Sequence, residues 1–194
     1  NSAIRTAVKD LASKGVAVIT YPKTGHVDYM EVAVRRAVVT GVNQTAGKLQ
    51  DARADELGSD LVEVTAHAGA RTGIGVGNHA EWQGKVYSRS GTHPKYPSLV
   101  EKTGYGTGPG LCGWGCRHNF FPFIEGVSEP AYNKAELEEM NAPKYEYNGQ
   151  KLTEEEATSR QRAIERNIRK WKREEAGMKA AGLSTDEAAA KVNQ

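Results

Sequence analysis

The sequence predicts an α+β fold, and three observations support this prediction. Two long segments, residues 27–58 and 154–181, carry apolar residues at helical spacing. Two short segments, residues 16–21 and 61–67, are β-branched or alternate between apolar and polar residues, as strands do. Residues 69–126 are rich in glycine and aromatic residues and follow neither period. We therefore expect N-terminal helices on a small β-sheet, a Gly/aromatic-rich loop lobe and C-terminal basic helices.

The N-terminal part supplies a helix, a strand, a turn and a long helix in that order. Residues 2–14 predict a helix with Ile4 and Val8 on one apolar face. The stretch "VAVITY" predicts a strand, and the following "PKTG" predicts a turn. The long helix over residues 27–58 should bury one apolar stripe. We expect this stripe to contain Met30, Val34, Ala37, Val38, Gly41 and Leu49.

Shorter elements complete the prediction. Apolar and polar residues alternate over residues 61–67, so one face of that strand, with Val62 and Val64, should be buried. Capping residues and turn dipeptides mark the other elements. In order, these are a helix at residues 98–102, a helix at residues 133–140, a hairpin centred on Asn148-Gly149, and a final helix with Ser184 as its N-cap.

The chain is long enough for one domain with a tail. It has 194 residues, of which 38% are hydrophobic and 26% charged, and its net charge is +2. We expect an α+β domain over residues 1–150, with its most distinctive motifs in residues 61–126, and a basic helical tail over residues 151–194. No apolar run approaches the roughly 18 residues that a membrane span needs. Two cysteines are too few for a disulfide framework.

Basic residues concentrate in the last long helix. Residues 160–173 contain seven basic residues and one acidic residue, although the whole chain carries only +2. Ile164, Ile168 and Trp171 fall at helical spacing and can pack inward. Two interpretations follow: a solvated surface helix paired with neighbouring glutamates, or a contact with nucleic acid or an acidic protein surface. The contact residues would be Arg162, Arg166, Arg169, Lys170 and Arg173.

Two segments hold most of the residues that could carry chemistry. The first is "HAEWQGKVYSRSGTHPKYP" at residues 79–97, and the second is "GLCGWGCRHNFFPF" at residues 110–123. Together they contain three of the five histidines, both cysteines and two of the three tryptophans. Such a set suits zinc chemically, but no second C-x2-C or H-x3-H pair is present, so we expect no metal and no other cofactor. The zinc candidates are Cys112, Cys116, His118 and His79, with His93 as an alternative to His79.

The same residues allow other interpretations. The two thiols could form a redox pair or a disulfide, or Cys116 could be a nucleophile with His79 or His118 as its base. The interpretation that we favour is structural. In it the histidines bond buried backbone groups, Arg117 pairs with a carboxylate, and the two tryptophans fill a small core. An enzyme would instead need its cysteine or histidine in an open cleft.

Longer motifs resemble a known family. Similarity to the C-terminal region of the phage minor capsid protein 2 family extends over residues 3–181 and rests on five motifs: "VDYMEVAVRRAVVTGVNQTA", "SDLVEVTAHAGAR", "NHAEWQGKVYS", "GYGTGPGLCGWGCRHNFFPFIEGVSE" and "RQRAIERNIRKWKREEA". The pairing of "HAEWQGK" with a later "CR" also resembles the wider Mu F-type head-morphogenesis proteins. The signature positions that carry over are His79, Trp82, Gln83, Gly84, Lys85, Cys112, Trp114, Cys116, Arg117 and His118.

The resemblance implies a low-copy structural protein of a tailed-phage head, near the portal vertex, that assists head assembly or DNA packaging or ejection. Portal and capsid proteins would be its partners, with packaged DNA as a further partner of the basic helix. The protein would be found in the virion and, during assembly, in the cytoplasm of the bacterial host. We carry over no catalytic residue. The alternative is a Cys/His-based enzyme or toxin-like domain carried in the head, because some Mu F-type relatives are fused to toxin domains.

The chain departs from the family pattern at two places. It lacks a counterpart of the N-terminal helical region and begins with Asn rather than Met, so we expect a fragment or a processed chain without that region's attachment to the portal. It also carries "TGIGVGN" at residues 72–78, where many members join more tightly. This insertion should lengthen one loop.

Overall fold

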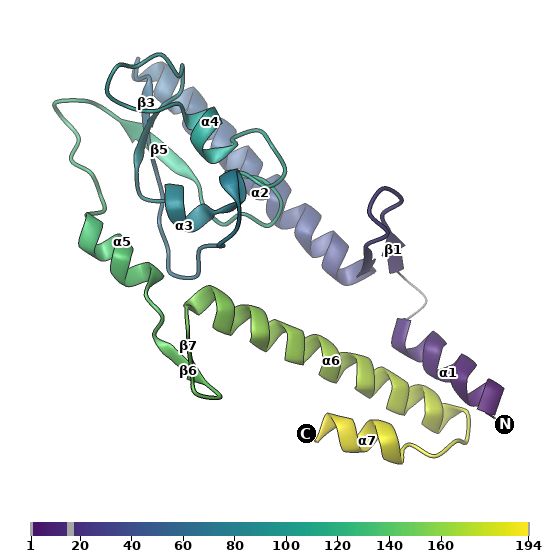
Figure 1. Ribbon diagram of the computed structural model, residues 1–194. Coiled ribbons are helices and arrows are strands. Elements are labelled where there is room, and N and C mark those ends of the chain that lie inside the picture. Colours follow the sequence, from purple (N-terminus) through teal and green to yellow (C-terminus); the bar gives the residue numbers. More distant parts are fainter. Residues whose placement is uncertain (1, 15–17, 194) are drawn as a thin grey trace. The chain divides into compact units, whose positions relative to one another are not determined.

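The computed structural model describes residues 2–14 and 18–193 (Figure 1). Contacts between residues divide the chain into two units, one from residues 1–35 and 159–194 and the other from residues 36–158. Two long helices, α2 (Met30–Glu56) and α6 (Glu154–Ala180), belong in part to each unit. The α+β prediction is confirmed, because helices combine with small antiparallel sheets. The sequence pattern suggested a boundary at residue 150 and gave no sign that the two ends of the chain share a unit.

The unit formed by the chain ends is mostly helical. Gly177 of α6 leaves room for the first helix, since a Cβ there would lie 2.7 Å from the Ala12 Cβ. Lys9 of the first helix pairs with Glu187 of the last helix at 3.0 Å. The elements of this unit are α1 (Ser2–Lys14), β1 (Val18–Thr20), β2 (Val27–Tyr29), parts of α2 and α6, and α7 (Asp186–Val192). In the part of the chain that the structure describes, no helix is apolar over a length that could cross a bilayer.

Three element boundaries in this unit differ from the prediction. The strand expected at residues 16–21 is described only from Val18, because residues 15–17 lie outside the described residues. The long helix begins at Met30 rather than at residue 27, since Val27–Tyr29 pairs with β1. The last helix has Thr185 as its N-cap instead of Ser184, whose hydroxyl donates to the Asp186 carboxylate at 2.8 Å.

The second unit is built on a three-stranded antiparallel sheet in the order β4–β3–β5. Its central strand β3 (Leu61–Val64) pairs with β4 (Val86–Ser88) on one side and with β5 (Phe120–Phe123) on the other. All four residues of β3 are buried, including Leu61 and Glu63, so the prediction of a single buried face is wrong. The chain after β5 returns to β3, where the Ala131 N–H donates to Glu63 Oε1 at 2.8 Å.

Short elements fill the glycine-rich segment and the stretch that follows it. The helices expected near residues 98–102 and 133–140 and the hairpin at Asn148-Gly149 are present. The helix at His79–Trp82 was not predicted, because four residues are too few to show a helical period. The elements are η1 (Gly75–Gly77), α3 (His79–Trp82), α4 (Leu99–Thr103), α5 (Lys134–Asn141), β6 (Tyr145–Tyr147) and β7 (Gln150–Leu152).

The C-terminal half of α2 belongs to the second unit and packs against the rest of that unit through small residues. Figure 1 shows its C-terminal half running beside β3 and β5. Its buried positions there include Thr40, Gly47 and Ala54, which are seven residues apart. A Cβ at Gly47 would lie 3.2 Å from the Cys112 sulfur and 3.7 Å from the Phe120 ring, so a small residue allows this close approach. The expected apolar stripe is therefore wrong, because these residues are exposed: Met30, Val34, Ala37, Val38, Gly41 and Leu49.

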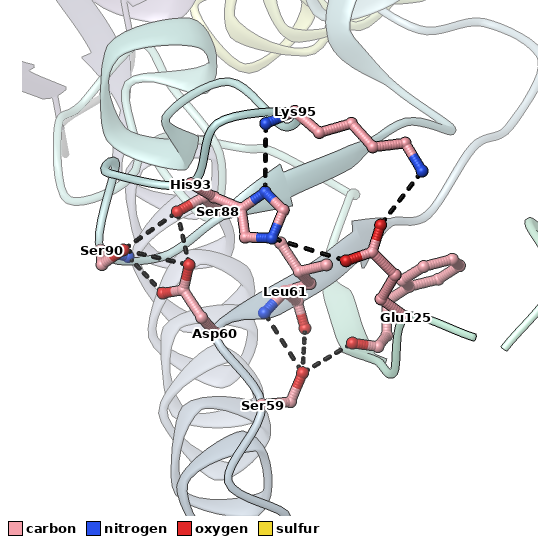
Figure 2. Close-up of polar contacts among 9 residues, drawn as sticks. Ser59, Asp60, Leu61, Ser88, Ser90, His93, Lys95 and Glu125 are labelled. Atoms are coloured by element: carbon pink, nitrogen blue, oxygen red, sulfur yellow. Dashed lines mark hydrogen bonds and ion pairs between the residues drawn. The ribbon is translucent and has the colours of Figure 1, made fainter. Parts of the chain in front are cut away.

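A polar network fixes the loops at one end of the sheet (Figure 2). Asp60, which precedes β3, accepts hydrogen bonds from the Ser88 hydroxyl at 2.6 Å and from the Ser90 N–H at 2.7 Å. The Ser59 hydroxyl donates to the Phe123 carbonyl oxygen at 2.6 Å. Partial burial acts to raise the pKa of the Asp60 carboxyl, but the hydrogen bonds from Ser88 and Ser90 hold this pKa below its usual value. Residues just before β3 therefore hold the ends of both neighbouring strands.

The Glu63 carboxyl should make stability depend on pH. Burial raises its pKa above the ordinary value of 4.5, although backbone N–H groups of Ala131 and Tyr132 act to lower it. Its Oε2 is buried without a hydrogen-bond partner among the described residues. Because the pKa is raised on folding, the free energy of unfolding should fall as pH rises from about 4.5 to the folded-state pKa.

We predict that Glu63→Gln removes this decline, since an amide does not titrate. Urea unfolding of wild type and variant between about pH 4 and pH 8 measures the slope. The exposed residue Glu129 supplies the control, and Glu129→Gln should keep the wild-type slope. Identical slopes for wild type and Glu63→Gln would contradict the assignment.

Candidate functional site

Five buried side chains from two segments converge beside the sheet. His79 opens α3 and Trp82 ends it, and Gln83 follows directly. Cys116 and His118 lie in the segment that leads into β5. All five are at most 3% exposed. The structure thus brings His79, Trp82 and Gln83 next to Cys116 and His118, and we refer to these five residues as the Cys–His cluster.

The sulfur of Cys116 lies between two imidazole rings. Its Sγ atom is 3.8 Å from His79 Nδ1 and 3.7 Å from His118 Nδ1. The two rings meet edge to face, with centroids 5.3 Å apart. The sulfur and the two nitrogens all lie within 4.8 Å of one another. Three atoms that can donate electron pairs to a metal therefore converge on one point.

The tautomer of each ring follows from the hydrogen bond that its Nε2 atom makes, since Nε2 is the ring nitrogen that faces away from the sulfur. His79 Nε2 lies 2.9 Å from the Pro109 carbonyl oxygen, which can only accept, so this Nε2 carries the hydrogen. His118 Nε2 lies 2.9 Å from Gln83 Oε1. That atom is an oxygen, because it also accepts from the His67 N–H at 3.0 Å. Both rings of the cluster therefore turn an unprotonated Nδ1 toward the sulfur.

Aromatic rings enclose the cluster. The Trp82 ring centroid lies 4.5 Å from that of His79 and 4.9 Å from that of His118. The Trp82 N–H donates to the Val76 carbonyl oxygen at 3.0 Å, so the indole is satisfied. His67 stacks on His118 with ring centroids 4.2 Å apart. The Nε2 atom of His67 is buried and has no hydrogen-bond partner among the described residues.

Burial keeps these groups uncharged. It lowers the pKa of His67 and of His79, and together with neighbouring histidines and arginines it lowers the pKa of His118 to about 2. Burial raises the pKa of the Cys116 thiol, against backbone hydrogen bonds that favour its thiolate. Burial also raises the pKa of the Cys112 thiol to about 12. At neutral pH the imidazoles are therefore neutral and the thiols protonated.

Two amide side chains outside the signature positions, Asn43 and Asn141, hold the cluster in place. Asn43 on α2 donates to the carbonyl oxygens of Cys116 at 3.1 Å and His118 at 2.9 Å. Gln83 donates to Asn141 Oδ1 at 3.1 Å. His67, which stacks on His118, is a neighbour of the cluster that sequence analysis also missed. Asn43 lies four residues before Gly47, and an amide so near the packing face of a helix is the signal that could have found it.

The loop that carries Cys112 depends on close backbone contacts. A Cβ at Gly110 would collide with the Gly104 carbonyl oxygen, and one at Gly113 would collide with another backbone carbonyl. Cys112 has a φ of 57°, a left-handed conformation that costs on the order of 1 kcal/mol for a residue with a side chain. Its Sγ lies 3.7 Å from the His118 carbonyl oxygen, beside the cluster.

Two signature residues lie elsewhere than the structural interpretation expected. Trp114 is 64% exposed and covers Gly108 from outside, so its assignment to a small core is wrong. Arg117 donates to the Gly69 carbonyl oxygen at 3.2 Å rather than to a carboxylate. The expectation overestimated burial because it treated each large side chain near the cysteines as part of one core.

The remaining signature residues and His93 lie outside the cluster. Gly84 has a φ of 65°. Lys85 is exposed, and its Nζ donates to the Glu81 carbonyl oxygen at 2.6 Å. His93 Nε2 lies 3.6 Å from Glu125 in the network of Figure 2. His93 therefore cannot complete a ligand set with Cys116.

The geometry distinguishes among the chemical roles considered for the cysteines, which are a disulfide, a nucleophile and a metal ligand. Both cysteines are free thiols. A nucleophilic role for Cys116 is disfavoured, because the residue is 1% exposed and its pKa is raised. Two open hollows of about 520 Å³ and 400 Å³ lie in this unit; Trp82 lines one and Cys112 the other, and neither lining includes Cys116. The donor set of Cys116, His79 and His118 can hold a metal ion.

The two tryptophans should differ sharply in their effect on stability. We predict that Trp82→Ala lowers the free energy of unfolding by about 3–5 kcal/mol, because a buried indole and its hydrogen bond are lost. Trp114→Ala should cost less than about 1 kcal/mol, because most of that side chain faces solvent. Urea unfolding of both variants measures the difference. Equal losses in the two variants would contradict the burial described above.

A family model and two phage proteins match this chain. The family model for phage minor capsid protein 2 matches residues 1–194. A structural protein of Lactococcus phage LL-H is 27% identical over 175 residues, which is 88% of this chain and 43% of that protein. A structural protein of Lactococcus phage mv4 is 31% identical over 96 residues, which is 50% of this chain and 68% of that protein.

The chain thus spans less than half the length of the LL-H relative. No solved structure matches it. The family match covers the helices, the sheet and the Cys–His cluster alike. On this evidence the chain belongs to the phage minor capsid protein 2 family.

Proposed function

We propose that this chain is a non-catalytic structural component of a tailed-phage head, located near the portal vertex, where it assists head assembly or DNA packaging or ejection. Its partners are then portal and capsid proteins, and it resides in the virion after assembly in the host cytoplasm. The family match and two phage relatives described as structural proteins support this proposal. The burial of Cys116 supports a non-catalytic role.

The observation that carries the proposal is an exposed apolar row on α2. Val38, Val42 and Leu49 are 60%, 66% and 67% exposed. Their spacing of four and seven residues puts them on one face of the helix, opposite to the small residues that pack inward. Exposed apolar rows of this kind mark contacts with other proteins. A subunit of an assembled head has such contacts, so the row suits a partner protein of the head.

This proposal can be tested in the phage that encodes the protein. We predict that Val42→Glu leaves the thermal stability of the purified chain unchanged but reduces its amount in purified virions. The control is Val127→Glu, because Val127 is 78% exposed and lies outside the row. Mass spectrometry of virions measures incorporation. Normal incorporation of Val42→Glu would contradict the role of the row.

Cross-linking of wild-type virions tests the location. Cross-links between this chain and the portal protein are expected if it lies near the portal vertex. Virions that contain the chain but give cross-links only to proteins distant from the portal would contradict the location.

The basic face of α6 supports DNA as a further partner. Arg162 and Arg166 are exposed, and no ion pair holds them within the described residues. Two other predicted contact residues pair with acids on the same helix: Arg169 with Glu165 at 3.9 Å, and Lys170 with Glu174 at 3.8 Å.

Arg173 and part of the expected inner stripe lie otherwise than the sequence indicated. The Arg173 guanidinium lies 4.2 Å from the Tyr29 ring centroid and is half-buried, so it is not on the free face. Ile164 is 48% exposed instead of packed inward, whereas Ile168 and Trp171 are half-buried. The face available to phosphates is therefore narrower than the sequence indicated.

We predict that the chain binds duplex DNA without sequence preference and that binding weakens by orders of magnitude between about 50 and 200 mM salt. The variant Arg162/Arg166/Arg169→Glu should lose this binding. A variant with the same change in net charge on exposed residues of the other unit, Lys102/Lys134/Lys151→Glu, should keep most of it. Equal binding by both variants, or none by wild type at low salt, would remove DNA as a partner and leave the head proteins.

A further inference from the structure

We propose that the Cys–His cluster is a structural zinc site, in which Cys116 Sγ, His79 Nδ1 and His118 Nδ1 bind one Zn²⁺. The proposal rests on the distances between these atoms, on the tautomers of the two rings and on the number of hydrogens available to them. It is independent of the role of the chain in the phage head.

The distances fit a tetrahedral metal ion. With Zn–S of about 2.3 Å and Zn–N of about 2.0–2.1 Å, tetrahedral angles put sulfur and nitrogen about 3.6 Å apart. The observed separations are 3.8 Å for His79 and 3.7 Å for His118. All three atoms lie within 4.8 Å of one another, so small side-chain movements close the site around an ion.

The outer contacts match those of zinc-bound histidines. A histidine ligand usually donates its other ring N–H to a carbonyl or carboxylate oxygen, which fixes the ring. His79 does so to the Pro109 carbonyl oxygen, and His118 does so to Gln83 Oε1, each at 2.9 Å. Both unprotonated nitrogens are thereby aimed at the same sulfur.

The number of hydrogens available at the site favours a bound metal ion over a thiol that only makes hydrogen bonds. The Cys116 thiol has one hydrogen, but three acceptors surround it: His79 Nδ1, His118 Nδ1 and the His118 carbonyl oxygen at 3.7 Å. A single hydrogen can serve one of them well, so at least one imidazole nitrogen is left buried without a donor. Zn²⁺ satisfies both nitrogens and the sulfur together, and the thiol proton leaves to solvent when the Zn–S bond forms.

The position of the site shows which segments of the chain a bound ion would link. His79 belongs to α3, while Cys116 and His118 precede β5, so one ion joins segments that are 37 residues apart along the chain. The three donor atoms leave the fourth tetrahedral position to a water molecule, because the Cys112 Sγ atom, 3.7 Å from the same His118 carbonyl oxygen, is not among the atoms that converge. All three donor residues are at most 2% exposed and neither open hollow reaches Cys116, so such an ion would hold the two segments together rather than meet a substrate.

The test uses the full chain, purified without a histidine tag or chelator and then equilibrated with ZnCl2 and dialysed. We expect about one zinc per chain by elemental analysis and a lower midpoint of thermal unfolding after treatment with a chelator. Loading with Co²⁺ in place of Zn²⁺ should give the thiolate-to-metal absorption and the visible bands of a tetrahedral cobalt site. A folded wild-type chain that keeps no metal, or whose cobalt form lacks the thiolate absorption, would overturn the proposal.

Variants locate the ligands. Cys116→Ala should lose the thiolate absorption, and His79→Gln should bind metal at least tenfold more weakly. The matched control is His93→Gln, which changes a histidine of the neighbouring network and should bind like wild type. If Cys116→Ala fails to fold, the cobalt spectrum of wild type and the comparison of His79→Gln with His93→Gln still decide the question. Equal metal binding by these two histidine variants would overturn the ligand set.

Discussion

The amide of Gln83 is the constraint on which the candidate site depends. Its oxygen accepts from the His67 N–H and from His118 Nε2–H, and its nitrogen donates to Asn141 Oδ1. A reversed amide would set donor against donor and acceptor against acceptor in a buried place, at about 1–3 kcal/mol for each group left unpaired. The amide therefore has one orientation. That orientation fixes the tautomer of His118, and so the direction of the Nδ1 lone pair that meets Cys116.

The fold class and most element types could be predicted, because helical period, alternation and turn dipeptides are local properties of a sequence. The face of α2 that packs against the rest of the second unit could not be predicted in this way. Pattern reasoning assigns the largest apolar residues to the interior, yet this helix lies so close to Phe120 and Cys112 that only residues such as Gly47 and Ala54 fit between. Close approach of backbones selected small side chains, and Val38 and Val42 were left in solvent.

The candidate site, like the fold, could be predicted only in part. The proximity of His79 to Cys116 followed from the need of glycine-rich loops for a shared core. The supporting residues could not be found in this way, because their partners are distant in the chain. Asn43, for example, is 73 residues from the carbonyl oxygen of Cys116 that it binds. Trp114 shows the opposite error, since a large aromatic side chain beside a buried cysteine need not itself be buried.

The sharing of one unit by both chain ends has a consequence for folding kinetics. Residues 36–158 are contiguous, so the second unit can form from contacts within its own span. The first unit must join residues such as Lys9 and Glu187, which are 178 positions apart. Closing so long a loop in an unfolded chain has a large entropic cost, and prior folding of the enclosed residues shortens the loop that remains. The second unit, which contains the Cys–His cluster, should therefore fold first, and the packing of residues 1–35 against residues 159–194 should be the late, slow step.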